Sequence, residues 1–445
     1  MNKQQQPVLK RTFSYLTLFL VLYMPVSLFF SRWLSLYTGG LGVWDASKDI
    51  LTLIDLVMAI WLLVPTLKEN KLLRVLFMTT AAYGLLHILF IVFNPKLDFR
   101  SAVVGVLFNG RVLAYFFIGA AAAKTLGTAF IKKSVHWMIG ISVVTCLFAV
   151  VQYVSPPGLM SHFGYSIERG VKPTFFIDDK PDFPRVMSTV RDPNSYGAYL
   201  ILPLCLLVVG YGVKIKRTAK NLAAILLHVV ALYLTFSRGA WLGTGIALAV
   251  IYVFKYGSTL RVYTAKQKRY LLIVLAVFVI LAGLVLSQRH TYFAENVLLH
   301  SDKQTTLATP NELRVQLQKR AALDIIKRPF GHGPGTAGLV SIGNPHGAYL
   351  TENYYLQIAY ELGLAGLALY MLILVVILIK LYKEAYKNQQ YVALGTYIAY
   401  AFIATLIHLW SNEVVAFQWW LYVGMVLFAI PKEPRSRINK TASIF

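Results

Sequence analysis

Long apolar runs recur along the 445-residue chain and set the strongest limit on its fold. Several of them exceed the roughly 20 apolar residues that an α-helix needs to cross a bilayer. Only 14% of the residues are charged, whereas a soluble protein carries about 25%. The sequence therefore predicts an all-α polytopic membrane protein. Because the first apolar run is not followed by a small-residue cleavage site, we expect an uncleaved first helix and not a signal peptide.

Hydropathy predicts about twelve membrane spans, within a single integral membrane domain over residues 1–445. The tenth run is long enough to contain a break. The predicted spans are 13–36, 47–65, 72–94, 101–123, 135–153, 194–213, 220–237, 239–256, 268–288, 352–382, 390–411 and 413–430.

Lys and Arg are divided unevenly between the loops on the two sides of the membrane. The loops on the side of the N-terminus hold more than half of the 43 Lys and Arg, but few acids. Such an excess marks cytoplasmic loops, so we expect both termini in the cytoplasm. Much of the +24 net charge is then a signal of topology. A nucleic-acid partner is not indicated, because basic and aromatic residues do not cluster on a soluble face.

This topology places two long loops outside the cytoplasm, at 154–193 and 289–350. Long loops in compact proteins are commonly functional, so we expect any chemistry to face outward. The second loop contains a helical pattern over 311–327 and then Gly-His-Gly-Pro-Gly at 331–335. This turn lacks the Lys-Ser/Thr ending of a nucleotide-binding loop, so no nucleotide is predicted. Its backbone amides are candidates to hold a phosphate.

Metal and disulfide chemistry are not indicated either. The two cysteines, Cys146 and Cys205, lie in apolar runs, where core packing is the simplest interpretation. We therefore predict no metal and no cofactor.

Two arginines stand close to or inside predicted spans. Arg111 interrupts the apolar run VVGVLFNGRVLAYFFIG. An arginine deep in a span costs about 2.5–3.5 kcal/mol on insertion scales, so it should face the bundle interior or a cavity. There it would line a substrate cavity or bond a helix carbonyl or Asp55. Arg238, beside Gly239, is the sole charge between two nearly continuous spans, and it either binds substrate or extends to the outer interface.

Arg185 and Arg191 approach the membrane on the outer side, where basic residues are disfavoured. Arg191 is followed by Asp192 and Pro193, which mark a helix start: Asp caps and Pro suits the first turn. A helix N-terminus with an arginine beside it also makes an anion site. Both interpretations stay open, and Arg185 and Arg191 are candidates to contact an anionic substrate.

Polar residues also stand at the head of the long apolar run TENYYLQIAYELGLAG, residues 351–366. Glu352 and Asn353 suit a helix start, and His346 lies just before them. With the outward arginines, they supply the groups needed for transfer from a phosphate-linked donor onto a hydroxyl. Arginines would hold the leaving diphosphate, and Glu352 or His346 would take the proton. Asn353 would orient the base or the acceptor sugar. His332, in the glycine-rich turn, is a further candidate to line the substrate cavity.

Four segments carry a resemblance to a known family: RDPNSYGAYL (191–200), TFSRGAWLG (235–243), KRPFGHGPG (327–335) and ENYYLQIAYELGLAG (352–366). They resemble the bacterial O-antigen ligase and polymerase superfamily, membrane glycosyltransferases of the C type. Ligases of the family carry a His followed by Asn, Ser or Gln, then nine residues, then Gly-x-x-Gly. Asn353, Gly363 and Gly366 fit this frame, whereas Glu352 occupies the position of the His that is proposed as base.

The resemblance implies an enzyme of the inner membrane, acting at its outer face on undecaprenyl-diphosphate-linked glycans. It implies metal-independent, inverting transfer to a glycan or lipid acceptor, by a protein that is surrounded by membrane lipids. It also implies diphosphate-binding roles for Arg191 and Arg314. Arg238 falls in a recurrent family motif. Residues 352–366 form the signature helix start. Since Glu352 replaces the ligase His there, we expect polymerisation of repeat units in preference to ligation. The alternatives are ligase-type transfer of a finished glycan to a lipid, protein or wall acceptor, and a transporter or flippase of lipid-linked sugars.

Overall fold

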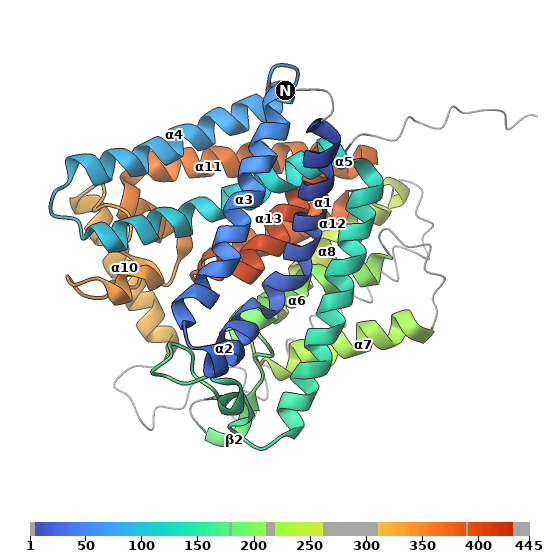
Figure 1. The fold of residues 1–445 in the computed structure, drawn as a ribbon, viewed down its shortest axis with the longest axis vertical. Coiled ribbons are helices and arrows are strands. Elements are labelled where there is room, and N and C mark those ends of the chain that lie inside the picture. The colour runs from blue at the N-terminus through green and yellow to red at the C-terminus, as the bar shows by residue number, and fades with distance from the viewer. Residues whose placement is uncertain (1–4, 178–179, 211–218, 261–309, 389, 430–445) are drawn as a thin grey trace, which may run out of the picture.

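The computed structural model describes residues 5–177, 180–210, 219–260, 310–388 and 390–429. The described chain is almost entirely helical (Figure 1), which confirms the predicted all-α class. The exception is a short antiparallel pair of strands, β1 (Phe175–Ile177) and β2 (Lys180–Arg185), in the first long loop.

The N-terminal third forms a series of long apolar helices. They are α1 (Gln5–Tyr23), α2 (Ser27–Thr38), α3 (Leu41–Leu67), α4 (Lys71–Phe93) and α5 (Phe99–Val154). Two short 3-10 turns, η1 (Met24–Val26) and η2 (Leu159–Phe163), interrupt or follow them. The predicted spans 101–123 and 135–153 merge into α5, which turns at Gly127, where φ is 74°.

The remaining helices follow the first long loop. They are α6 (Pro193–Val209), α7 (Ala219–Leu234), α8 (Arg238–Leu260), α10 (Pro310–Lys327), α11 (Tyr354–Asn388), α12 (Tyr391–Ile403) and α13 (Glu413–Phe428), with 3-10 turns η4 (Gly338–Gly343) and η5 (Leu409–Ser411).

Membrane character follows from the length and composition of these helices. Five described stretches are long and apolar enough to cross a membrane, and α6, α7, α12 and α13 are shorter apolar helices. The predicted number of twelve spans is not confirmed, and the predicted span 268–288 lies outside the described residues. The five stretches are Gln6–Thr38, Leu41–Leu67, Lys71–Phe93, Phe99–Val154 and Tyr354–Ala385.

The predicted span 390–411 is wrong in extent. Helix α12 ends at Ile403, and residues 404–412 form an irregular connection that contains η5. Asn412 then starts α13, because its Oδ1 accepts the amides of Val414 at 3.1 Å and Val415 at 3.2 Å. Average hydropathy does not reveal the end of α12, because the residues after it are also apolar. The capping asparagine is the local sequence signal of the new helix.

Helix α13 lies in the centre of the bundle (Figure 1). All of its residues after Glu413 are buried. It packs closely against α5, where a Cβ added to Gly119 would lie 2.2 Å from the carbonyl oxygen of Leu421. A Cβ added to Gly424 would lie 2.2 Å from the carbonyl oxygen of Phe116. Glycine at both positions is therefore what lets the two backbones touch, as small residues do between membrane helices.

Candidate active site

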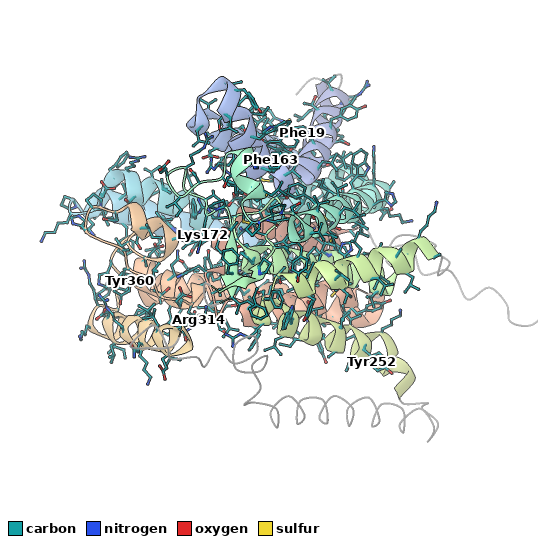
Figure 2. The ribbon with its side chains drawn as sticks, turned by 90° about the horizontal axis from the view of Figure 1, so that it is seen from below. Phe19, Phe163, Lys172, Tyr252, Arg314 and Tyr360 are labelled. Atoms are coloured by element: carbon teal, nitrogen blue, oxygen red, sulfur yellow. The ribbon has the colours of Figure 1, made fainter. Side chains whose placement is uncertain are left out.

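Helix α10 brings one predicted arginine against the predicted carboxylate. Arg314 donates from Nε to Oε2 of Glu352 at 3.2 Å, although 38 residues separate them in sequence. Their side chains are 35% and 24% exposed, respectively. The pair is thus fixed in position and still accessible to a substrate. Figure 2 labels Arg314 on α10 and Tyr360 on the neighbouring α11.

The backbone of Glu352 is strained. Its φ is +48°, in the left-handed region that non-glycine residues rarely adopt. Such a conformation costs about 1–3 kcal/mol and persists only where the surroundings hold it. Here the Glu352 amide donates to Nε2 of His408 at 3.1 Å, and its carbonyl accepts from Nε2 of Gln318 at 2.8 Å. Strain held by buried contacts from other elements is typical of functional sites.

His408 is a member of this cluster that sequence reasoning missed. Its Nδ1 lies 2.9 Å from Oε1 of Gln357. Since that oxygen only accepts and the Glu352 amide only donates, the proton is on Nδ1 and Nε2 is the acceptor. Burial lowers the pKa of His408, so the ring is neutral at pH 7. A histidine within an otherwise apolar run, LIHLW, was the available signal.

Asn353 has the capping role that its position suggested. Its Oδ1 accepts the amides of Tyr355 at 2.9 Å and Leu356 at 3.1 Å, at the start of α11. Its Nδ2 donates to the carbonyl of Thr405 at 3.0 Å. The side chain therefore joins the head of α11 to the irregular connection that contains His408.

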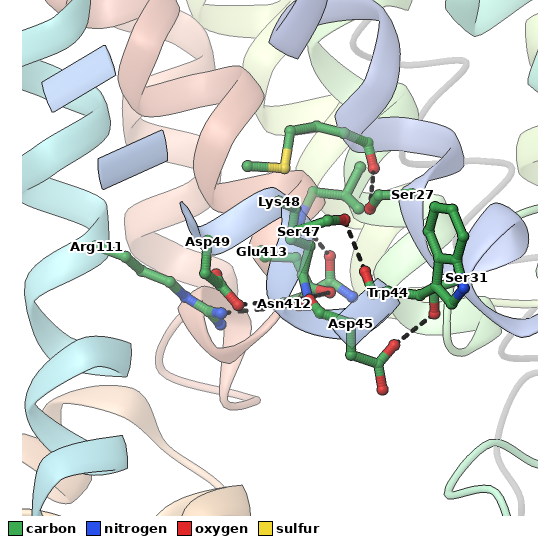
Figure 3. Close-up of polar contacts among 12 residues, drawn as sticks. Ser27, Ser31, Trp44, Asp45, Ser47, Lys48, Asp49, Arg111, Asn412 and Glu413 are labelled. Carbon is green, nitrogen blue, oxygen red and sulfur yellow. Dashed lines mark hydrogen bonds and ion pairs between the residues drawn. The ribbon is translucent and has the colours of Figure 1, made fainter. Parts of the chain in front are cut away.

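Arg111 holds the same connection through two carbonyls. It donates to the carbonyl oxygens of Trp410, at 3.3 Å, and Ser411. Its Nη1 also lies 3.8 Å from Oε2 of Glu413 (Figure 3). The predicted bond to a carbonyl is thus confirmed. The alternative partner, Asp55, is wrong, because its carboxylate accepts from the hydroxyl of Thr17 at 3.0 Å.

Glu413 gathers further positive charge around this end of α13. Nζ of Lys48 lies 3.9 Å from its Oε1 (Figure 3). Arg191, which is exposed, also interacts electrostatically with Glu413. The connection between α12 and α13 therefore joins the Arg314–Glu352 pair to a second charged cluster, in which Arg111 and Lys48 contact Glu413.

The helix start after Arg191 is a capped one, as predicted. Asp192 accepts the Ser195 amide at 2.9 Å, and Pro193 begins α6. Arg185 is engaged structurally, donating to the carbonyl of Thr235 at 2.9 Å and to Oδ1 of Asn194 at 2.8 Å. It ties the end of β2 to the start of α6 and to the turn before α8, whose first residue is the half-buried Arg238.

The expectation that the 331–335 turn offers its amides to a phosphate is wrong. The amides of Gly335 and Ala337 donate to Oε1 of Glu361 at 3.0 and 3.2 Å. Those of His332 and Gly333 donate to the carbonyls of Tyr360 and Glu361 at 2.9 and 2.7 Å. The fully buried carboxylate of Glu361, inside α11, thus accepts backbone amides that the sequence had suggested were available to a ligand. This is the role of Glu361 within an apolar helix.

His346 and His332 lie together in a cavity of about 430 Å³, which Tyr349, Tyr360 and Arg328 also line. His346 is exposed there, and its amide donates to Oδ1 of Asn344 at 2.9 Å. The structure therefore groups His346 with His332. The Glu352 carboxylate has Arg314 as its partner instead.

One comparison with known proteins bears on this arrangement. Residues 222–371 match the O-antigen ligase family. The match confirms the resemblance to the O-antigen ligase and polymerase superfamily, and it supports a glycosyl-transferring membrane enzyme. It includes α10, the glycine-rich turn and the start of α11, hence Arg314 and Glu352. No curated protein matches the chain.

The glycine frame seen in the O-antigen ligase family has a structural basis in this chain. Helix α11 kinks at Gly363, where φ is 69°, as the predicted break required. A Cβ there would lie 2.5 Å from the carbonyl carbon of Phe330, so the position is closed to other residues. After the kink, the Leu364 amide donates to the carbonyl of Pro329 at 2.9 Å. The kink therefore anchors the glycine-rich turn against α11.

Both cysteines are free and buried, in agreement with a packing role for Cys146 and Cys205. Within the described part of the chain, His, Cys, Asp and Glu form no group of three that could hold a metal ion.

Proposed function

We propose that the protein is a glycosyltransferase of the cytoplasmic membrane that polymerises undecaprenyl-diphosphate-linked repeat units at the outer face. The observation that carries this proposal is the Arg314–Glu352 pair, which lies just before the start of α11. Glu352 has a strained backbone and a partly exposed carboxylate beside a guanidinium, and both residues fall within the O-antigen ligase match. This arrangement suits proton removal next to a departing diphosphate.

In the proposed reaction, an acceptor hydroxyl oxygen forms a bond to the anomeric carbon of the donor sugar. The bond between that carbon and the diphosphate oxygen breaks on the opposite face, which inverts the configuration. Glu352 takes the hydroxyl proton, and the diphosphate leaves with the bonding electrons. Because a guanidinium has five N–H donors, Arg314 can hold Glu352 through Nε and bind the diphosphate through its terminal nitrogens. Arg191 adds positive charge, while Arg238 keeps a proposed accessory role.

His408 has a different role, as a positioning residue. Its Nε2 already accepts the Glu352 amide, so it cannot take a proton from the acceptor without releasing that bond. Instead it fixes the backbone angle that aims the carboxylate. His346 stays the competing base, and its exposed position in the neighbouring cavity favours Glu352 over it.

Polymerisation is preferred over ligation because Glu352 stands where the family's ligases carry His. Transfer of a finished glycan to a lipid, protein or wall acceptor is the second candidate. A transporter or flippase is the third candidate. Alternating access would need a site near the middle of the membrane, whereas the charged groups gather around the α12–α13 connection, at the start of α13.

The test supplies purified protein in nanodiscs with a defined undecaprenyl-diphosphate oligosaccharide. Chain growth supports a polymerase, and a single transfer to an added acceptor supports a ligase. Arg314→Ala and Arg191→Ala should abolish transfer, whereas Arg314→Lys should restore it only in part, because Lys cannot bind two oxygens as a fork. Arg100→Ala, an exposed arginine in the first turn of α5, is the matched control. No transfer under any of these conditions would refute the proposal.

A further inference from the structure

The cavity of about 430 Å³ has no part in the transfer step proposed above. Its volume lies within the range of small-molecule sites. Its wall includes three side chains of fixed positive charge, Lys96, Arg320 and Arg328. Asn94 and Asn344 add amide groups, and none of the described residues that line the cavity is acidic. The charged groups of the lining are therefore all basic.

One side of the cavity is a stack of four planar groups. The rings of His332 and Tyr360 lie 3.9 Å apart with 5° between their planes. The Tyr360 and Tyr349 rings lie 4.1 Å apart at 16°. The guanidinium of Arg320 sits over the Tyr349 ring, 4.8 Å from its centroid. Two nearly parallel rings this close to Tyr360 must occupy its opposite faces. The order is then His332, Tyr360, Tyr349, Arg320.

Stacking decides which part of the Tyr360 ring the cavity meets. The faces of an aromatic ring are negative and its edges positive. Both faces of Tyr360 are covered by its neighbours, so its edge meets the ligand space. The stack thus adds to the positive potential of Lys96 and Arg328.

One carboxylate lies near the stack and must be counted. Asp324 accepts from the hydroxyl of Tyr349 at 2.6 Å, and its oxygens lie 3.9 Å from Nε of Arg320 and 3.8 Å from Nζ of Lys327. It balances part of the charge of Arg320 and fixes the stack in place. A second carboxylate, Asp98, interacts electrostatically with His346. Neither Asp324 nor Asp98 lines the cavity, so Lys96 and Arg328 remain to meet an anion.

Two elements lead from the cavity to Glu352. Tyr349 lines the cavity and precedes Glu352 by three residues, which span at most about 11 Å of chain. On α10, Arg320 follows Arg314 by six residues, or about 9 Å along the helix. The cavity is therefore within a few sugar units of the Arg314–Glu352 pair.

We propose that this cavity binds an anionic sugar residue of the acceptor glycan and so directs the neighbouring hydroxyl to Glu352. The acceptor role rests on the proposed function, whereas the preference for an anionic sugar rests on the lining of the cavity. The anion is either the carboxylate of an acidic sugar or a phosphate carried by a sugar, since both match guanidinium and ammonium donors.

The test measures calorimetric binding to the full-length protein in nanodiscs of a zwitterionic lipid. The probes are digalacturonic acid, glucose 1-phosphate and the neutral disaccharide cellobiose. At least one anionic probe should bind ten times more tightly than cellobiose, and the tighter of the two identifies the source of the anion. Arg328→Gln and Lys96→Gln should each weaken that binding about tenfold. Arg100→Gln, which removes the same charge from an exposed site outside the cavity, should not.

Equal binding of neutral and anionic probes would overturn the proposal, as would unchanged binding in both cavity variants. Loss of sugar binding when phosphatidylglycerol is added to the nanodiscs would identify a lipid headgroup as the occupant and also overturn it. Glu352→Gln should bind the anionic probe normally. If the unaltered protein binds the anionic probe but transfers no glycan, the proposed function and the acceptor role are refuted, whereas the anionic-sugar site is supported.

Discussion

Glu361 makes a quantitative prediction because its carboxylate is fully buried and accepts three hydrogen bonds. Asn109 Nδ2 donates to its Oε2 at 2.7 Å, and the amides of Gly335 and Ala337 donate to its Oε1 at 3.0 and 3.2 Å. Glu361→Leu keeps an apolar side chain of similar size but leaves all three donors buried and unpaired. Each unpaired donor costs about 1–3 kcal/mol, so the free energy of unfolding should fall by about 3–9 kcal/mol.

Glu361→Gln should be far milder. The Gln oxygen can replace Oε1 and keep both backbone amides, while its NH₂ group would face the NH₂ of Asn109. A flip of Asn109 resolves this conflict, because its Oδ1 has no hydrogen-bond partner among the described residues. The flip gives up the 3.3 Å contact between Asn109 Nδ2 and Nε2 of His87. The cost is that of about one hydrogen bond, roughly 0.5–1.5 kcal/mol.

Thermal unfolding of the purified variants in detergent measures both changes. Leu364→Ala, at an exposed position three residues further along α11, is the control for substitution in this helix. We expect the order control, Glu361→Gln, Glu361→Leu, from most to least stable. The reasoning is refuted if Glu361→Leu unfolds within about 1 kcal/mol of the unaltered protein, since three buried donors would then carry no cost.

Three further predictions concern local structure and pH. Glu352→Gly should be at least as stable as Glu352→Ala in thermal unfolding, because glycine relieves about 1–2 kcal/mol of left-handed strain, although both variants should lose transfer. Asp192→Ala should lower the free energy of unfolding by about 0.5–2 kcal/mol through loss of the α6 cap. Asp192→Asn should keep most of that stability, because its side-chain oxygen can also cap; equal losses in the two variants would argue against capping. Burial lowers the pKa of His408, so the unfolded chain binds a proton that the folded protein lacks as the pH falls below about 6.5. Unfolding measured from pH 8 to 5 should show stability decreasing below that pH, and His408→Gln should reduce the slope.

Local signals in the sequence predicted local structure well. The apolar runs gave the membrane class, and Asp192 and Asn353 were recognisable as caps from the residues around them. The length of the tenth apolar run indicated a break, which the structure places at Gly363. The apolar runs depend on composition and the caps on contacts within a few residues, so the sequence alone contains the information for them.

Contacts between segments that are distant in the sequence could not be predicted from it. The amide of Glu352 meets His408 across 56 residues, and Glu361 meets the 331–337 backbone across at least 24. Periodicity gives no indication of such pairs. The same reason explains the error at the end of α12, where an apolar run leaves the helix after Ile403 to bring His408 to the site. The sequence supplied the chemical groups, and only the fold showed which of them meet.

The central claim is that Glu352 accepts the proton of the acceptor hydroxyl. The most direct test is the single-turnover transfer rate of Glu352→Gln, with undecaprenyl-diphosphate oligosaccharide bound at saturation, beside Glu352→His, His346→Ala and the exposed control Glu168→Gln. Loss of a general base costs about 10²- to 10⁴-fold, so we expect Glu352→Gln to slow by that factor, Glu352→His to recover part of it, and Glu168→Gln to be unchanged. Full activity of Glu352→Gln, with loss only in His346→Ala, would contradict the account and assign the proton to the histidine.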